Sequence, residues 1–218
     1  MRAAFTLLEL LFSMVIIGLV FTVFPKIIQL SAKTPKYTLK EEALYNGVAL
    51  AGLIKNLPWD EKNTRLNDIL ITDAGDEDYK CDYAFANSNR IYRKGSFVGS
   101  RNCIHKEPAS AIGLEEATVD GADDVDDFNG YEKDAVNYNG SRDFKLKVGI
   151  SYIKDINITQ EKFDNISTSD STNLKFVKVD ILPVSRRAKS LGDNVAVFWY
   201  ISSNIGQLKI NSQPWSGQ

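Results

Sequence analysis

The hydrophobic positions divide the chain into an apolar beginning and an alternating end. From Phe5 to Phe24 most residues are apolar, and Glu9 is the only charged side chain. Apolar residues lie on all sides of a helix drawn through this stretch rather than on one stripe, so an amphipathic core helix fits poorly. About 20 such residues match the roughly 30 Å hydrocarbon layer of a bilayer. The pattern predicts a single membrane-spanning helix over residues 5–25.

A secretory signal peptide is the alternative interpretation of this run. Its apolar region would be only about 7 to 15 residues long and would follow a clear basic segment. Here Arg2 is the only basic residue before the run, and the only cleavage-like site after the run is Leu30, Ser31 and Ala32. The membrane helix is therefore favoured.

A second helical stretch follows within residues 26–58. Thr34 and Pro35 resemble an N-cap and a first helical position, and Thr38 with Glu41 resembles a capping box. Pro58 is expected to end the helix. Apolar residues form an imperfect helical stripe: Leu39, Ala43, Val48, Ala51, Leu53, Ile54 and Leu57. We expect a stalk helix that continues out of the membrane and buries one face against a sheet.

The last third of the chain has strand patterns. Residues 144–152 alternate apolar and polar side chains, which is typical of a strand with one wet face. Residues 176–181 switch phase, which indicates a bulge or a strand buried on both faces. Residues 195–201 are apolar throughout, as in a central strand. We expect an α+β head over residues 59–218, with an antiparallel sheet packed on a helix.

Composition and charge exclude several classes of function. The 218 residues include 26 Lys plus Arg, 28 Asp plus Glu, one His and two Cys, with a net charge of -2. This balance argues against a wholly basic nucleic-acid binder. One His and two Cys leave too few ligands for most zinc sites and no usual His-dependent triad. No catalytic motif is found, so His105 is interpreted as a loop residue and no enzyme is expected; a membrane-anchored hydrolase is a distant alternative.

The beginning of the apolar run carries a family resemblance. Ala4, Phe5, and the stretch from Thr6 to Glu9 resemble the processing site of type IV pilins and type II secretion pseudopilins. The resemblance implies a leader peptide of residues 1–4, cleavage before Phe5 by a prepilin peptidase, and methylation of the new N-terminus. The family prefers Gly before the cut, and Ala4 departs from that preference.

The resemblance also implies a role for Glu9. In the family, a glutamate at this place helps to dock each subunit in a filament. If the Glu9 carboxylate lies near the charged amine of Phe5 on a neighbouring subunit, the two buried charges compensate each other and fix the axial register between the helices. The alternative is that Glu9 lies hydrated at the membrane interface.

The family layout is a lollipop, in which a long transmembrane and stalk helix packs on an antiparallel β-sheet head. It implies a minor pilin or pseudopilin that spans the bacterial inner membrane once, with its head in the periplasm. The implied partners are other pilins or pseudopilins and the inner-membrane assembly platform. Which system, secretion, pilus or competence, uses the chain is left open.

Cys81 and Cys103 lie beyond the membrane helix. In an exported head they would enter an oxidising compartment, where a disulfide bridge is expected. Two buried free thiols are the alternative.

Acidic residues are concentrated in one segment. Residues 115–134 contain nine acids and one lysine, a local net charge of -8, so the remainder carries +6. The segment has the density of oxygen ligands that calcium takes, although Phe128 occupies a ligand position of an EF-hand. The candidate ligands are Asp123, Asp124, Asp126, Asp127 and Asn129. A solvated surface loop is the alternative.

A binding role at a filament tip, as an adhesin or DNA-uptake subunit, is the second functional hypothesis. Aromatic and basic residues that could meet bases and phosphates are interleaved at Arg90, Tyr92, Arg93, Lys94 and Phe97. Because only a few basic residues cluster there, a solvated hairpin is favoured and nucleic acid is not an expected partner.

Overall fold

The computed structural model describes residues 7–66, 68–86, 90–96, 101–103, 105–115, 121–136, 140–156 and 166–206. The chain divides into two compact units, residues 1–42 and residues 43–218. The first helix, α1 (Leu7–Lys55), begins in the first unit and ends in the second. The unit boundary falls inside the range predicted for the stalk helix.

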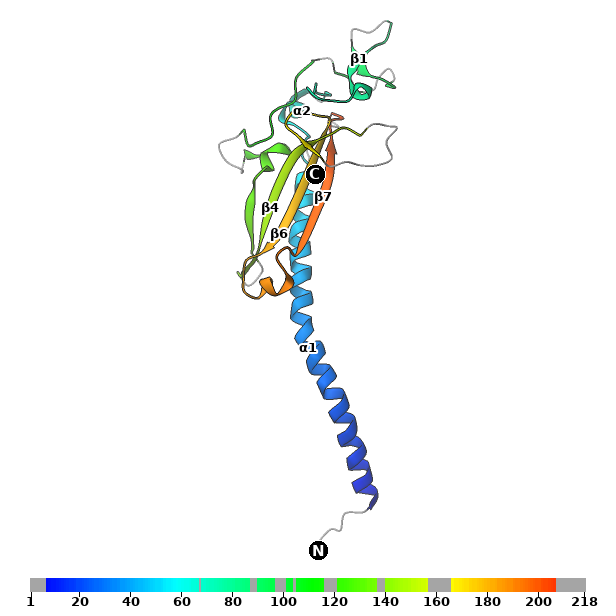
Figure 1. Ribbon diagram of the computed structural model, residues 1–218, viewed down its shortest axis with the longest axis vertical. Coiled ribbons are helices and arrows are strands. Elements are labelled where there is room, and N and C mark those ends of the chain that lie inside the picture. The colour runs from blue at the N-terminus through cyan, green and yellow to red at the C-terminus, as the bar shows by residue number, and fades with distance from the viewer. Residues whose placement is uncertain are drawn as a thin grey trace, which may run out of the picture. The chain divides into compact units, whose positions relative to one another are not determined.

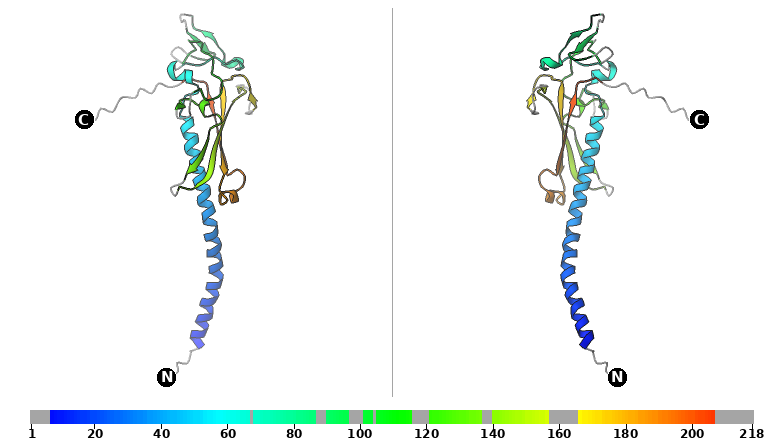
Figure 2. Two further views of the ribbon diagram at one scale, coloured as in Figure 1. Left: turned by 90° about the vertical axis from the view of Figure 1, so that its left-hand side faces the viewer. Right: turned by 90° about the vertical axis from the view of Figure 1, so that its right-hand side faces the viewer.

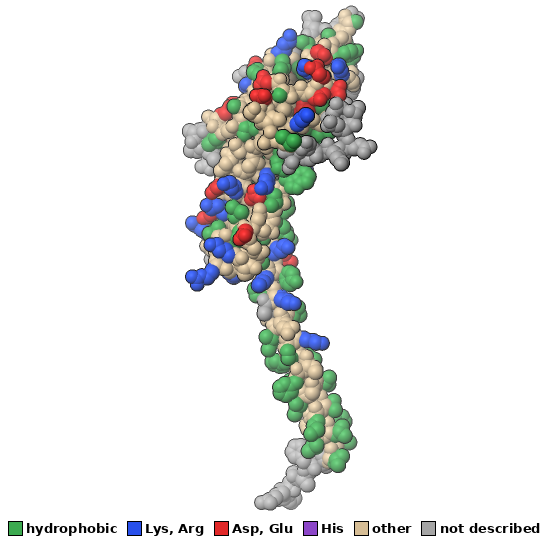
Figure 3. Space-filling model, in the orientation of Figure 1, with side chains coloured by type: hydrophobic (Ala, Val, Ile, Leu, Met, Phe, Trp, Pro, Cys, Tyr) green, Lys and Arg blue, Asp and Glu red, His purple; other side chains and the backbone are tan. Residues whose placement is uncertain are grey.

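The first unit consists of the N-terminal part of α1. Its large apolar side chains between Leu7 and Leu30 are all exposed, from 47% at Val20 to 83% at Leu7. Figure 3 shows these side chains along the helix. By length and composition this helix, near the N-terminus, could cross a membrane, as the sequence predicts.

The predicted start of a second helix at Thr34 and Pro35 is wrong, because α1 runs through both Pro25 and Pro35. The Thr34 hydroxyl donates to the Leu30 carbonyl at 3.0 Å, and the Thr38 hydroxyl donates to the Thr34 carbonyl at 3.2 Å. A threonine hydroxyl can bond back to the preceding turn as readily as it can cap a helix. The cap-like residues are therefore interior positions of one continuous helix.

The second unit contains the end of α1 and the head. Besides the short helix α2 (Glu61–Leu66), it has the 3-10 turns η1 (Glu77–Tyr79), η3 (Asp126–Phe128) and η4 (Ala188–Leu191). Its strands are β1 (Cys81–Ala84), β2 (Ile91–Arg93), β3 (Glu132–Val136), β4 (Arg142–Ile153), β5 (Ser167–Thr168), β6 (Leu174–Pro183) and β7 (Ala196–Ser203).

The strands form two antiparallel sheets. β1 and β2 pair as a small hairpin, and the main sheet has the order β3-β4-β6-β7, with β5 added to β4. The predicted antiparallel sheet packed on a helix is confirmed at this level. Figures 1 and 2 show α1 beside β4, β6 and β7 in this unit.

The alternation predicted over residues 144–152 is confirmed in β4. Phe144, Leu146, Val148 and Ile150 are buried, and the intervening residues are more exposed. β6 pairs with β4 without a register shift, so the predicted bulge near Phe176 is absent. Its phase switch has another cause, because Phe176 stacks on Trp199 of β7 on the outer side.

The prediction that residues 195–201 form a central strand is wrong. β7 lies at the end of the strand order and pairs with β6 alone among the described strands. Trp199 is 59% exposed, whereas Phe198 and Tyr200 pack against the core. The run is apolar although the strand lies at the edge, because Phe198 and Tyr200 pack against the core while Trp199 stacks on Phe176 on the opposite face.

The core of the second unit lies between the sheet and the end of α1. Ile54 of α1, Val148 of β4, and Val177 and Val179 of β6 are almost fully buried in one cluster. Phe128 of η3 closes the same cluster. The acidic segment is therefore fixed to the core by its own apolar residue.

Candidate functional site

The residues predicted to direct processing and assembly lie at the start of the chain. Ala4 and Phe5 fall outside the described residues. Glu9 lies in the first turn of α1 and is exposed, among exposed leucines.

The predicted cysteine pair forms a disulfide between Cys81, the first residue of β1, and Cys103. Their Cα atoms are 6.1 Å apart, and Cys103 is fully buried. The Cys103 amide also donates to the Ile91 carbonyl of β2 at 2.8 Å. The bridge therefore secures the segment after β2 to the small hairpin.

The centre of the acidic segment does not form a solvated loop, because its carboxylates are buried. Asp124, Asp126 and Asp127 are each exposed by 3% or less. Asp124 Oδ1 accepts the backbone amides of Asp126 and Asp127 at 2.8 and 3.2 Å. Asp127 Oδ2 accepts the amides of Asp123 and Asp124 at 3.1 and 3.3 Å. These carboxylates shape the turn around η3.

Asn129 links the turn around η3 to the main sheet. Its side-chain oxygen accepts the Ile150 amide of β4 at 3.0 Å. Of the five candidate calcium ligands, only Asp123 and Asn129 are exposed. Within the described ranges, no group of three or more His, Cys, Asp or Glu side chains is placed to hold a metal ion. Calcium binding by this segment stays a prediction.

A buried lysine meets these carboxylates. Lys175 of β6 is fully buried, and its Nζ bonds to Asp126 Oδ1 and donates to the Trp59 carbonyl at 2.7 Å. Asp60 Oδ2 lies 3.6 Å from the same Nζ. Lys175 has the same inward phase as Val177 and Val179, so the strand itself aims this side chain into the core.

The neighbours of Lys175 are also held in place. Asp60 accepts the Ser110 amide at 2.7 Å through Oδ2, and the Lys62 amide at 3.1 Å through Oδ1. The Tyr152 hydroxyl donates to the Ser110 carbonyl at 2.7 Å. Lys175, Asp126, Asp60, Trp59 and Tyr152 are hereafter called the Lys175 cluster.

Burial changes the protonation of the carboxyls here. Desolvation raises the pKa of Asp126 to about 8, with the Lys175 ammonium opposing this change. Desolvation likewise raises the pKa of Asp124 to about 7, again opposed by Lys175. Both carboxyls therefore keep their protons to a higher pH than an exposed aspartate does.

A second polar network lies beside β1 and β2. Asp155 accepts the Asn173 amide at 2.8 Å and the Asn173 side-chain NH₂ at 2.7 Å. Asn173 also accepts a bond from Arg93, whose guanidinium donates to the Asn204 carbonyl at 2.7 Å. Tyr92 is buried. Two residues of the proposed nucleic-acid motif therefore serve the interior, and Phe97 lies outside the described residues.

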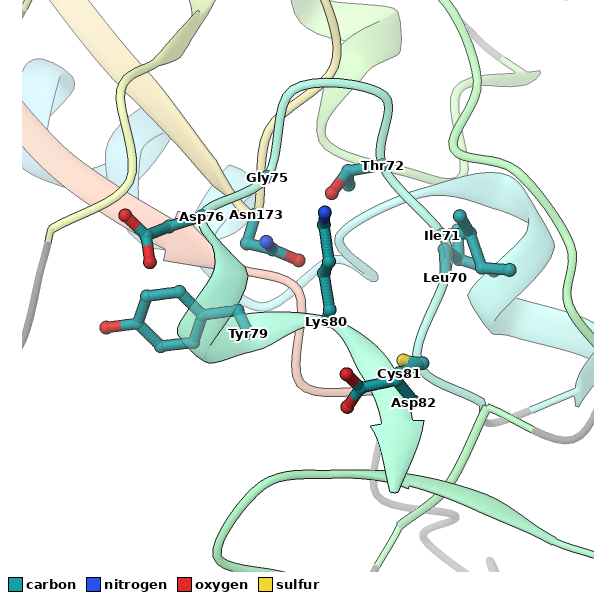
Figure 4. Close-up of a pocket in the computed structure, with 10 residues that line it drawn as sticks. All are labelled: Leu70, Ile71, Thr72, Gly75, Asp76, Tyr79, Lys80, Cys81, Asp82 and Asn173. Atoms are coloured by element: carbon teal, nitrogen blue, oxygen red, sulfur yellow. The ribbon is translucent and has the colours of Figure 1, made fainter. Parts of the chain in front are cut away.

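A pocket of about 230 Å³ opens next to this network. Figure 4 shows Lys80, Thr72 and Asn173 lining it together with apolar Leu70 and Ile71. His105 lies elsewhere, with Nδ1 3.1 Å from Asp68 Oδ2.

Sequence reasoning missed Lys175, Asp60 and Trp59. Lys175 does carry a signal, because it is the one charged residue on the apolar phase of β6. Asp60 and Trp59 follow Pro58 in an irregular stretch, where no periodicity marks them.

Comparisons of the chain with protein-family models, with curated proteins and with solved structures gave no match.

Proposed function

We propose that the chain is a structural subunit of a bacterial filament, a minor pilin or pseudopilin of a type IV pilus or type II secretion system. The observation that carries the proposal is the nature of α1. Its first part exposes apolar side chains from Leu7 to Leu30, and its last part buries Ile54 in the core of a folded head.

An exposed apolar helix of this length is not stable in water, because each large side chain would lose roughly 1.5–3 kcal/mol of burial energy. Lipid would cover it while the subunit is stored in the inner membrane. Other subunit helices would cover it after assembly. The same surface thus serves as an anchor and as an assembly element.

Glu9 supports the assembly role on physical grounds. It is the only charged residue of α1 before Lys26. A carboxylate at membrane depth is costly unless its charge is compensated. We assign this compensation in the filament to the N-terminal amine of Phe5 on a neighbouring subunit, after cleavage between Ala4 and Phe5 by a prepilin peptidase.

The disulfide between Cys81 and Cys103 supports export of the head. Structural disulfides persist in oxidising compartments such as the periplasm. The proposed partners are other pilins or pseudopilins and the inner-membrane assembly platform.

The experiment is to replace Glu9 and measure incorporation into sheared filaments. Glu9→Ala should lower incorporation at least tenfold while the amount in the membrane stays unchanged. Thr22→Ala is the matched control, because Thr22 lies on the same apolar helix and its hydroxyl bonds only to carbonyls of the preceding turn. Equal incorporation of both variants would contradict the assembly role.

A further inference from the structure

We propose that Lys175 and Asp126 become joined by an intramolecular isopeptide bond, formed within the folded head with Asp60 as the proton-transfer group. This modification is independent of filament assembly. It would link β6 to η3 through their side chains.

The reacting groups are already in contact. Lys175 Nζ bonds to Asp126 Oδ1, and both side chains are almost completely buried. The same Nζ donates a hydrogen bond to the Trp59 carbonyl at 2.7 Å. This bond fixes the orientation of the amine next to the Asp126 carboxyl group. Holding two reactants in this way replaces an encounter in solution by a step within one molecule.

Aromatic rings and burial keep water away from the reacting pair. Lys175 Nζ lies 3.9 Å from the centre of the Trp59 ring and 5.4 Å from that of the Tyr152 ring. Asp126 Oδ2 is buried and has no hydrogen-bond partner among the described residues, as expected for an oxygen that leaves as water.

Asp60 is placed to move the proton. Its Oδ2 lies 3.6 Å from Lys175 Nζ, and backbone amides of Ser110 and Lys62 hold its carboxylate. The side chain is fully buried, as are those of the reacting pair.

The reaction balances without an oxidant or other co-reactant. A proton first passes from the Lys175 ammonium to the Asp126 carboxylate, which gives a neutral amine and a neutral acid. The Nζ lone pair attacks Cγ of Asp126 and forms the C–N bond. Asp60 takes a proton from Nζ and returns it to one Asp126 oxygen, and the C–O bond breaks as water leaves. The products are one amide and one water, with Asp60 again a carboxylate.

The position of the bond gives it a structural consequence. Lys175 and Asp126 are 49 residues apart in the chain. Phe128 of η3 and Val177 of β6 belong to the same core as Ile54 of α1. A covalent link at this point would keep η3 on the sheet even when the hydrophobic core loosens.

The experiment is peptide mapping by mass spectrometry of the full chain, purified in detergent, then denatured, reduced and digested with trypsin. The wild type should give a branched peptide that joins the segments containing Asp126 and Lys175, lighter by one water than the two linear peptides together. Linear peptides alone in the wild type would overturn the proposal.

Variants separate the proposed bond from other losses of water. Lys175→Met should abolish the branched peptide. Lys178→Met should retain it, because Lys178 lies at an exposed position of the same strand and its side chain pairs with Asp180. A loss of water that persists in Lys175→Met would mean a succinimide at Asp126 and would contradict the bond. Asp60→Asn should leave most of the chain uncrosslinked; full crosslinking in that variant would overturn the role of Asp60.

Discussion

Gly47 of α1 lies directly against Ile181 of β6. A Cβ added at Gly47 would stand 2.4 Å from Ile181 Cδ1 and 2.6 Å from Cε2 of the Phe198 ring. The helix and the sheet are therefore so close at this point that only glycine fits without a shift of the neighbouring side chains.

This contact predicts the effect of a single methyl group. Gly47→Ala should lower the free energy of unfolding by about 1–3 kcal/mol, because the Phe198 ring and the end of Ile181 would have to shift to admit the methyl group. Gly52→Ala is the control on the same helix, where an added Cβ meets nothing within 4 Å. That variant should gain up to about 1 kcal/mol from helix propensity. Chemical denaturation of both proteins in detergent tests the pair, and equal stabilities would contradict the packing.

The disulfide between Cys81 and Cys103 predicts a loss of stability on reduction. Replacing both cysteines by serine should cost about 3 kcal/mol in the chain-entropy model, because the unfolded chain is no longer constrained. Reducing agent should likewise lower the melting temperature of the wild type. A reductant that leaves the melting temperature unchanged would argue against a structural bridge.

Asp124 predicts how stability depends on pH. Its pKa is about 7 in the folded chain, against an ordinary value of 3.8. The folded chain therefore holds this proton more tightly than the unfolded chain, so the free energy of unfolding falls as pH rises from about 4 to about 7. The full effect of such a shift is up to about 4 kcal/mol.

Asp124→Asn isolates this contribution, because an amide oxygen can still accept the amides of Asp126 and Asp127. The variant should show a flatter dependence of unfolding free energy on pH between 4 and 7. Asp123→Asn is the control, since Asp123 is exposed and accounts for less of the dependence. An Asp124→Asn curve parallel to that of the wild type would refute this assignment.

Calcium binding to the acidic segment predicts a thermal shift. Calcium at about 10⁻⁴–10⁻³ M, the range of extracellular sites, should raise the melting temperature of the full chain, and less in Asp123→Asn. Asp123 is the relevant position because Asp124, Asp126 and Asp127 already bond to backbone amides or Lys175. Melting curves that stay unchanged at millimolar calcium would contradict calcium binding by this segment.

The elements predictable from sequence are those whose environment is local. β4 has one wet face and one buried face, so its alternation encodes it directly. The apolar helix is equally visible, since membrane depth demands an uninterrupted run. The disulfide needed only the compartment and the number of cysteines.

The features that escaped prediction depend on distant partners. The edge position of β7 is set by which strands pair, not by its own residues. The continuity of α1 through Pro35 could not be inferred, because Thr34 carries the signal of a cap. Lys175 is tolerated in the core only because Trp59 and Asp126, distant in the chain, meet it there.

The central claim is that this chain is processed and assembled as a filament subunit, and the mature N-terminus tests it most directly. Full-length protein would be expressed with a prepilin peptidase, recovered from the membrane, and its first residue identified by mass spectrometry. The account predicts that the chain begins at Phe5 with an N-methyl group, after removal of residues 1–4. A mature chain that begins at Met1, or after Ala32, would contradict it.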